Sequence, residues 1–234
     1  GELVKRLSEP KSPLAIAGTM RATLDGSWES LSDVEKSVLA QASIFAAPFG
    51  IEAAEEIVSL PARAASDDDD DRSGDVLDAL ESLVKRSLLT RTAGADGKAY
   101  ARLAMFETVR AWAREKLDAR ERVALAKRHA AYHLAEAEHA ALRAYGAGAI
   151  ASLDRLEELL PELQSAFAAM KEREPRTAVR IVLALSDLLL FRGLFELRAD
   201  LFDRGVEAAE QPPEAGRDRV LVDIHSEVND CGSR

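Results

Sequence analysis

Residues 75–103 read DVLDALESLVKRSLLTRTAGADGKAYARL, and the period of the hydrophobic pattern changes within this stretch. Up to Arg86 the apolar residues recur at helical spacing behind Asp75, a residue type suited to cap a helix N-terminus. Beyond it, β-prone residues at 88–92 and 100–103 flank a Gly-Ala-Asp-Gly turn signal at 94–97. The stretch therefore predicts a helix followed by a small β-hairpin.

The preceding residues predict two further helices. Ser32 and Glu35 have the spacing of a capping box, in which each side chain bonds the other's backbone N–H. The apolar residues around it recur at helical spacing and form one face of the predicted helix: Leu31, Val34, Val38, Leu39, Ala42 and Phe45. Pro48 and Gly50 are expected to stop this helix, and a short one follows at 51–58. With a helix expected at 107–117, the order of elements predicts a winged-helix domain over residues 14–118.

The acidic run Asp67–Asp71 interrupts this domain. Five adjacent like charges repel one another and offer no apolar face, so we expect a disordered acidic loop over residues 65–74. A divalent-cation site is the alternative, but calcium loops space their ligands and include a turning glycine.

Residues 119–234 are expected to form a helical-hairpin array resembling tetratricopeptide repeats. Amphipathic stretches separated by short breaks predict helices at 120–144, 150–172, 176–192, 195–210 and 215–228. Pro161 either breaks the second of these or starts a new helix. No clean self-match at a period of about 34 residues is present. The predicted fold class is mainly α, with one β-hairpin.

Composition narrows the class of protein. Of 234 residues 47% are hydrophobic and only 5% aromatic, which is typical of packed helices, and the net charge of −10 opposes nucleic-acid binding. One cysteine, Cys231, excludes a disulfide framework and is interpreted as a spectator thiol. No apolar run reaches the ~18–20 residues that cross a bilayer, and 181–191 is interpreted as a buried core helix. We expect a cytoplasmic protein without membrane contact.

Three stretches carry a family resemblance: SWESLSDVEKSVLAQASIFAAPFGIEAAEEIV at 27–58, DVLDALESLVKRSLLTR at 75–91 and MFETVRAWAREKL at 105–117. In this order and spacing they resemble the winged-helix region of STAND-type signalling ATPases, relatives of the NB-ARC proteins that include bacterial transcriptional regulators. RHAAYHLAEAEHA and LDRLEELLPELQSAFAAM, at 128–140 and 153–170, resemble the helices that connect this region to tetratricopeptide-like repeats.

The resemblance implies an upstream nucleotide-binding domain, which would bind ATP or ADP and be the winged helix's partner. Residues 1–13 would be a linker from that missing domain, and the helical region would be truncated at its C-terminus. No G-x-x-x-x-G-K-[ST] motif is present. Residues 94–98 have the wrong glycine spacing and lie between two predicted strands. We therefore expect no cofactor in this chain and no enzymatic activity.

Met105, Phe106 and Glu107 lie where this family often carries a Met-His-Asp motif, whose histidine senses bound diphosphate. A phenyl ring cannot donate a hydrogen bond to phosphate, so the resemblance implies no direct nucleotide sensing here. Phe106 is expected in the core, and Glu107 in the first turn of a helix, where the helix dipole favours an acid.

The histidines suggest no catalytic set and no metal site. His129 and His133 have the i, i+4 spacing of zinc ligands, but the only further candidates along the helix are Glu136 and His139. Packing between helices, or a place on the helix surface, accounts for the pair better. His225 is isolated, and no Ser/His/Asp or Cys/His arrangement follows from spacing.

Three functions remain open. The first is a regulatory module, whose winged helix packs on the nucleotide-binding domain and whose helical array binds protein partners. The second is a transcription factor that grips DNA with the 75–86 helix and the 88–103 wing, and the third is an enzyme of unknown type. The candidate DNA contacts are Lys85, Arg86, Arg91, Lys98 and Arg102. Acidic residues on the 75–86 helix oppose this alternative.

Overall fold

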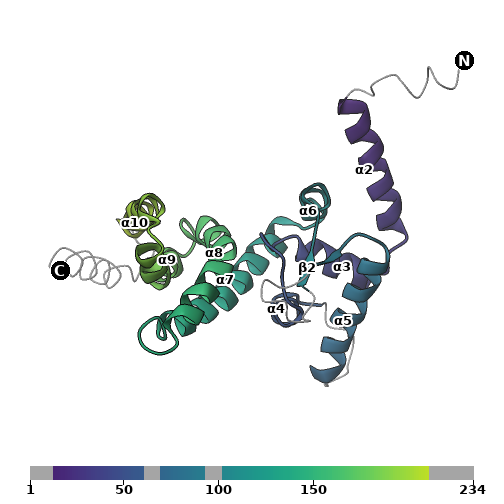
Figure 1. Cartoon of the computed structure of the whole chain (residues 1–234). Helices are drawn as coiled ribbons and strands as arrows, with labels where there is room; N and C mark the ends of the chain where they lie inside the picture. The colour runs from purple at the N-terminus through teal and green to yellow at the C-terminus, as the bar shows by residue number, and fades with distance from the viewer. Residues whose placement is uncertain (1–12, 61–68, 93–101, 211–234) are drawn as a thin grey trace, which may run out of the picture. The chain divides into compact units, whose positions relative to one another are not determined.

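The computed structural model describes residues 13–60, 69–92 and 102–210 (Figure 1). The chain is mainly helical with one two-stranded antiparallel sheet, as the sequence predicted. It divides into two compact units, one formed by residues 1–43 and 60–117 and the other by residues 44–59 and 118–234. None of the described helices is long and apolar enough to cross a membrane.

The first unit contains α2 (Pro13–Glu29), α3 (Asp33–Ala42), α5 (Asp69–Lys85), β1 (Thr90–Thr92), β2 (Arg102–Ala104) and α6 (Glu107–Arg114). Helix α3 packs against both α5 and α6. The core of this first unit consists of leucine, valine, alanine and tryptophan side chains, among them Leu39, Leu80, Leu83, Leu103 and Trp112. This order of helices and strands confirms the predicted winged-helix domain.

Helix α2 was not predicted from the sequence. Trp28, in its last turn, packs edge-on against Trp112 of α6, with ring centroids 5.5 Å apart. The indole Nε1 of Trp112 donates to Asp25 Oδ1 at 3.0 Å, and Lys116 Nζ lies 3.2 Å from the same oxygen. These tertiary contacts, rather than a hydrophobic stripe, tie α2 to the domain.

The predicted capping box begins α3. Ser32 Oγ accepts from the Glu35 backbone N–H, and Glu35 Oε2 accepts from the Ser32 N–H at 2.6 Å. The carboxylate is itself buried, where it accepts a hydrogen bond from Ser82 Oγ on α5 at 2.5 Å. It lies 3.4 Å from Arg86 Nε. Glu35 therefore joins a helix cap to a contact between two helices.

Helix α5 begins at Asp69, six residues before the predicted cap at Asp75. The predicted acidic loop is therefore helical over 69–74, and its residues 65–68 lie outside the described residues. Acidic groups are favourable in the first turn of a helix, because they face the positive end of its dipole. The backbone of Asp69–Asp71 thus belongs to the helix that the acidic run was expected to precede.

The turn from α5 into the hairpin is set by Ser87, whose φ is +60°. The backbone N–H groups of Leu88 and Leu89 then donate to the Leu83 carbonyl oxygen, which satisfies the end of the helix. In the sheet, Thr90 pairs with Ala104, Arg91 with Leu103 and Thr92 with Arg102. The hairpin is confirmed but shorter than predicted, and its predicted turn at 94–97 lies outside the described residues.

The second unit contains α4 (Ile51–Ile57), α7 (Ala119–Ala141), α8 (Ala149–Met170), α9 (Pro175–Phe191) and α10 (Phe195–Glu210). In Figure 1, α7 to α10 form successive layers, each packed on the next. Their shared core is leucine and alanine, with Phe167, Met170 and Phe202 filling the larger spaces. Helix α8 continues through Pro161, so the proline neither breaks it nor begins a new helix. The helix predicted at 215–228 lies outside the described residues.

Helix α4, which we predicted within the winged-helix domain, groups by its contacts with this second unit. It packs against α7, where Arg128 Nε donates to the Ile57 carbonyl oxygen at 2.7 Å. The preceding backbone at Ala46 and Ala47 donates to Glu162 of α8. These polar contacts come from residues more than 70 positions away, which local sequence patterns do not report.

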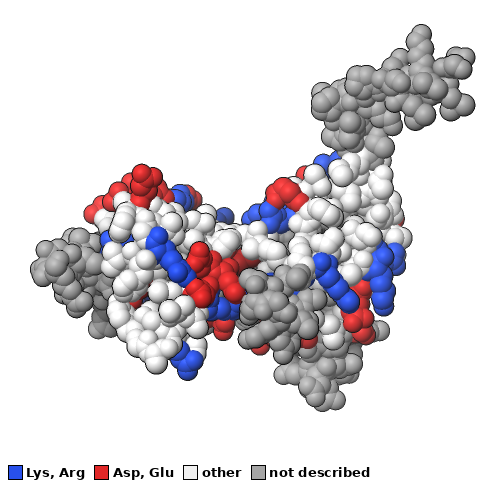
Figure 2. All heavy atoms as spheres, in the orientation of Figure 1, with Lys and Arg blue, Asp and Glu red and all other residues white. Residues whose placement is uncertain are grey.

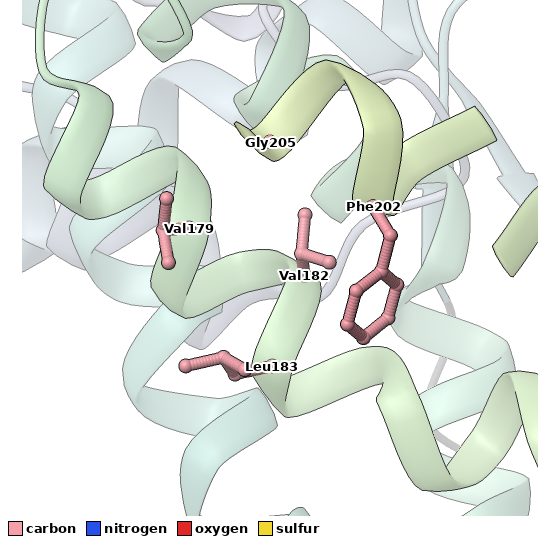
Figure 3. A pocket seen from close by; sticks show the side chains of 5 residues that line it. All are labelled: Val179, Val182, Leu183, Phe202 and Gly205. Carbon is pink, nitrogen blue, oxygen red and sulfur yellow. The ribbon is translucent and has the colours of Figure 1, made fainter. Parts of the chain in front are cut away.

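A shallow apolar hollow lies on α9 and α10, lined by Val179, Val182, Leu183, Phe202 and Gly205 (Figure 3). A Cβ at Gly205 would lie 3.4 Å from Val182 Cγ2, so the glycine lets the two helices approach closely. The hollow offers no polar side chain to orient a substrate, and it is a feature of helix packing.

We predict that Glu35→Gln destabilises the chain by roughly 2 kcal/mol at pH 7, because it removes a charged acceptor of buried hydrogen bonds. The hydrogen bond from Ser82 lowers the pKa of Glu35 from 4.5 against the opposing effect of burial, and the bonds from Ser32 and the charge of Arg86 add to it. Because the pKa of Glu35 is lower in the folded than in the unfolded chain, its ionised form stabilises the fold at pH values above the unfolded-state pKa. That stabilisation is lost as the pH falls through the folded-state pKa.

Urea unfolding at a series of pH values measures the contribution of Glu35 to the free energy of unfolding. The stability difference between wild type and Glu35→Gln should be largest near neutrality and shrink below about pH 4.5. Asp78→Asn on the exposed face of α5 is the matched control and should show neither the loss nor its pH dependence. A Glu35→Gln deficit that stays constant down to pH 3 would contradict the assignment.

Candidate functional site

Two of the proposed DNA-contacting cations lie at the C-terminal end of α5. Lys85 has a side chain 78% exposed and forms a weak ion pair with Glu81, at 3.9 Å. The Arg86 side chain is 41% exposed but is engaged by its own domain: its Nη1 donates to Ser30 Oγ at 3.1 Å and its Nε lies 3.4 Å from Glu35 Oε1. Arg86 therefore acts as a structural cation that holds the start of α3 to the end of α5.

The hairpin adds little positive charge to this face. Arg91 is exposed in the middle of β1, Arg102 on β2 is half-buried, and Lys98 lies outside the described residues. Asp78 and Glu81 are exposed on α5, and Glu81 pairs with Lys85. On the face shown in Figure 2, blue and red side chains intermingle over the described part of this unit. Phosphate backbones are bound by clustered cations, which this arrangement does not provide.

The structure places Phe106 on the surface, with 61% of it exposed, so the prediction of a core position is wrong. Phe106 is the N-cap of α6, and its backbone is extended rather than helical. The inward positions of α6 begin later, at Val109 and Trp112, so the ring precedes the buried stripe. Glu107 lies in the first turn, as predicted, and forms an ion pair with Arg110. Met105 is half-buried.

An exposed apolar surface lies at one side of the helical array. The C-terminal ends of α7 and α9 and the N-terminal ends of α8 and α10 lie at this side of the array. Large hydrophobic side chains are exposed there. We call this set the apolar end: Leu142, Tyr145, Ile150, Leu190, Phe191, Leu194 and Phe195. The rings of Tyr145 and Phe191 lie 6.2 Å apart, which brings the two helix junctions together.

Sequence reasoning missed the apolar end. We interpreted residues 181–191 from the sequence as a buried core helix, but Leu190 and Phe191 at its end are 40% and 54% exposed. Helical periodicity identifies the buried face of α9 but does not show where the neighbouring helices stop. Scattered exposed hydrophobics are ordinary, whereas several large ones gathered at one side of a domain are typical of interaction surfaces.

Two of the four histidines, His129 and His133, are buried on α7. His129 and His133 are 1% and 4% exposed on α7, and Glu162 of α8 lies against His129. The partners considered from the sequence do not join them: Glu136 pairs with Arg155, and His139 is exposed. Glu162 was missed because it lies 33 residues from His129 along the chain. One signal was available, since a glutamate occupies the stripe of Leu156, Leu159, Leu163 and Ala166.

Comparison with known proteins adds one match. Residues 31–118 match a family model described as a winged helix-turn-helix domain, a stretch that runs from the start of α3 to just beyond α6. No curated protein and no solved structure matches the chain. The element order and this match agree, and the chain contains a winged helix-turn-helix domain over residues 31–118.

Proposed function

We propose that the chain is a non-catalytic regulatory and protein-interaction part of a STAND-type signalling ATPase or transcriptional regulator, acting in the cytoplasm. In this proposal the winged helix packs on a nucleotide-binding domain that supplies the ATP or ADP site, and the helical array binds protein partners. The apolar end is the observation that carries it. Seven large hydrophobic side chains exposed on one side of a well-packed array suit protein burial.

The winged helix supports the same proposal through Phe106. Its position matches the sensor motif of the family that the sequence resembles, and its ring is exposed at the start of α6. An exposed phenyl ring cannot bind phosphate, but it can anchor a contact between domains, because aromatic side chains dominate the energy of such interfaces. The resemblance thus implies a packing role where the family's histidine senses nucleotide.

Direct DNA binding is the second candidate, because the matched domain type includes DNA-binding members and Lys85 and Arg91 are exposed. Three facts weigh against it: the net charge of −10, the internal use of Arg86, and the acidic residues on α5. Like charges at the surface repel a phosphate backbone over about a Debye length.

For DNA, we predict no saturable binding of mixed-sequence duplex at low salt, measured by fluorescence anisotropy up to tens of micromolar protein. Low salt strengthens phosphate attraction and gives DNA binding its best chance. A Lys85→Ala/Arg91→Ala double variant should give the same flat titration. Salt-sensitive micromolar binding that the double variant loses would instead favour a DNA-binding transcription factor.

For the winged helix, we predict that Phe106→Ala weakens association with the separately produced nucleotide-binding domain of the same protein by about tenfold. Calorimetric titrations with ADP and with ATP present would measure this. Because Phe106 is exposed, the thermal midpoint of the isolated chain should not change. Thr108→Ala, an exposed neighbour on α6, is the control. If the two domains do not associate with either ADP or ATP present, the proposed packing is refuted.

For the helical array, we predict that Ile150→Lys/Phe195→Lys abolishes a protein contact without unfolding the array. A photo-cross-linking amino acid at Phe191, in cells that make the protein, should capture a protein that the double variant no longer captures. The same probe at Glu172, an exposed residue in the turn after α8, should not capture it. Equal capture from both positions would show that the apolar end has no special role.

A further inference from the structure

A cluster of metal-binding side chain types lies inside the second unit, unused by the proposed function. His129 and His133 are one turn apart on α7, and Glu162 comes from α8. All three are buried, and one ligand atom from each lies within 4.8 Å of the others. Residues 44–49 line the same region, with Phe45 in edge contact with both imidazoles.

Glu162 is fixed in place by three hydrogen bonds. Oε1 accepts from the Ala47 N–H at 2.8 Å, and Oε2 from the Ala46 N–H at 3.0 Å. Oε2 also lies 2.7 Å from His129 Nε2, which donates because an ionised carboxylate can only accept. Burial alone would raise the pKa of Glu162, but these hydrogen bonds and the His129 ring hold it below its usual value. The cluster therefore contains a buried carboxylate anion.

His133 has no such partner. It is 4% exposed, and neither Nδ1 nor Nε2 has a hydrogen-bond partner within the described parts of the chain. Burial, followed by the neighbouring His129, lowers the pKa of His133 to about 4, so the ring is neutral at pH 7. A leucine would fill this volume without burying two unpaired nitrogens. An unpaired buried polar group of this kind calls for an unseen partner, such as an ion.

We propose that His129, His133 and Glu162 bind one divalent transition-metal ion, with Zn²⁺ the best fit. The i, i+4 spacing places both imidazoles on one side of α7, facing α8, and two imidazole nitrogens with one carboxylate oxygen are a zinc donor set. Magnesium and calcium prefer all-oxygen sites, which this cluster does not offer.

Binding requires small movements and the loss of one proton. Ligand atoms about 2.1 Å from a tetrahedral ion lie roughly 3.4 Å from one another. The His129–Glu162 pair at 2.7 Å must therefore open slightly, and the widest separation, which is at most 4.8 Å, must close. The proton on His129 Nε2 leaves to solvent as the ion takes its place, and the imidazole ligand carries its one remaining proton on Nδ1. A water completes the coordination.

The surroundings assign the ion a structural role. Phe45 and Tyr132 contact the His133 ring edge-on, and Phe49 stacks on Phe45. The cluster joins α7, α8 and the backbone before α4. An ion there would fix this end of the array and the position of α4. The alternative is a metal-free hydrogen-bonded core, which the following test separates from the proposal.

The test titrates Zn²⁺ into metal-free chain by calorimetry and follows the thermal midpoint. We expect one equivalent bound with micromolar or tighter affinity, and a midpoint rise of about 5–10 °C at a hundredfold excess over Kd, reversed by EDTA. Co²⁺ in its place should give the visible absorption of a tetrahedral site.

The variants make the test specific. His133→Leu should fold at least as stably as wild type without metal but lose the zinc-induced rise, and Glu162→Gln should weaken binding at least tenfold. His139→Ala removes an exposed histidine of the same helix, and Cys231→Ser removes the only thiol; both should bind like wild type. Zinc uptake that survives in His133→Leu, or no uptake by the wild type, overturns the proposal.

Discussion

The helical array depends on a buried carboxylate, Glu162, which joins three segments distant in sequence. It accepts hydrogen bonds from the backbone at Ala46 and Ala47 and from His129. Removing an ionised carboxylate from water is costly, and only such donors repay the cost. These bonds accompany the grouping of residues 44–59, by their contacts, with the helical array, where α4 packs against α7. A leucine here would pack equally well but would not hold those backbone N–H groups.

Glu35 performs the corresponding role in the winged-helix unit. It closes the capping box of α3, accepts from Ser82 and pairs with Arg86. Arg86 is thereby engaged in contacts within the domain, although 41% of its side chain stays exposed. Together with exposed Phe106 and the apolar end, this favours a role in protein contacts.

Much of the fold could be predicted from local pattern. The capping box at Ser32 and Glu35, the hairpin at the change of period and the bounds of α10 were anticipated, because each depends on residues within a few positions. One error arose where distant residues decide, because α2 is held by Trp112. Two others are local. Helix α5 begins earlier, within the acidic run that we expected to be a loop. Phe106 is exposed because the buried stripe of α6 starts after it.

The sequence by itself determined the helical class, the winged-helix order and the absence of a P-loop motif, since hydrophobic period, caps and motif spacing are local properties. It also placed His129 and His133 on one side of a helix. Only the tertiary structure showed that Glu162 joins them, that Arg86 is engaged and that seven hydrophobic side chains gather at one end of the array. These facts depend on helix packing, because side chains 33 or more residues apart meet only when their helices dock.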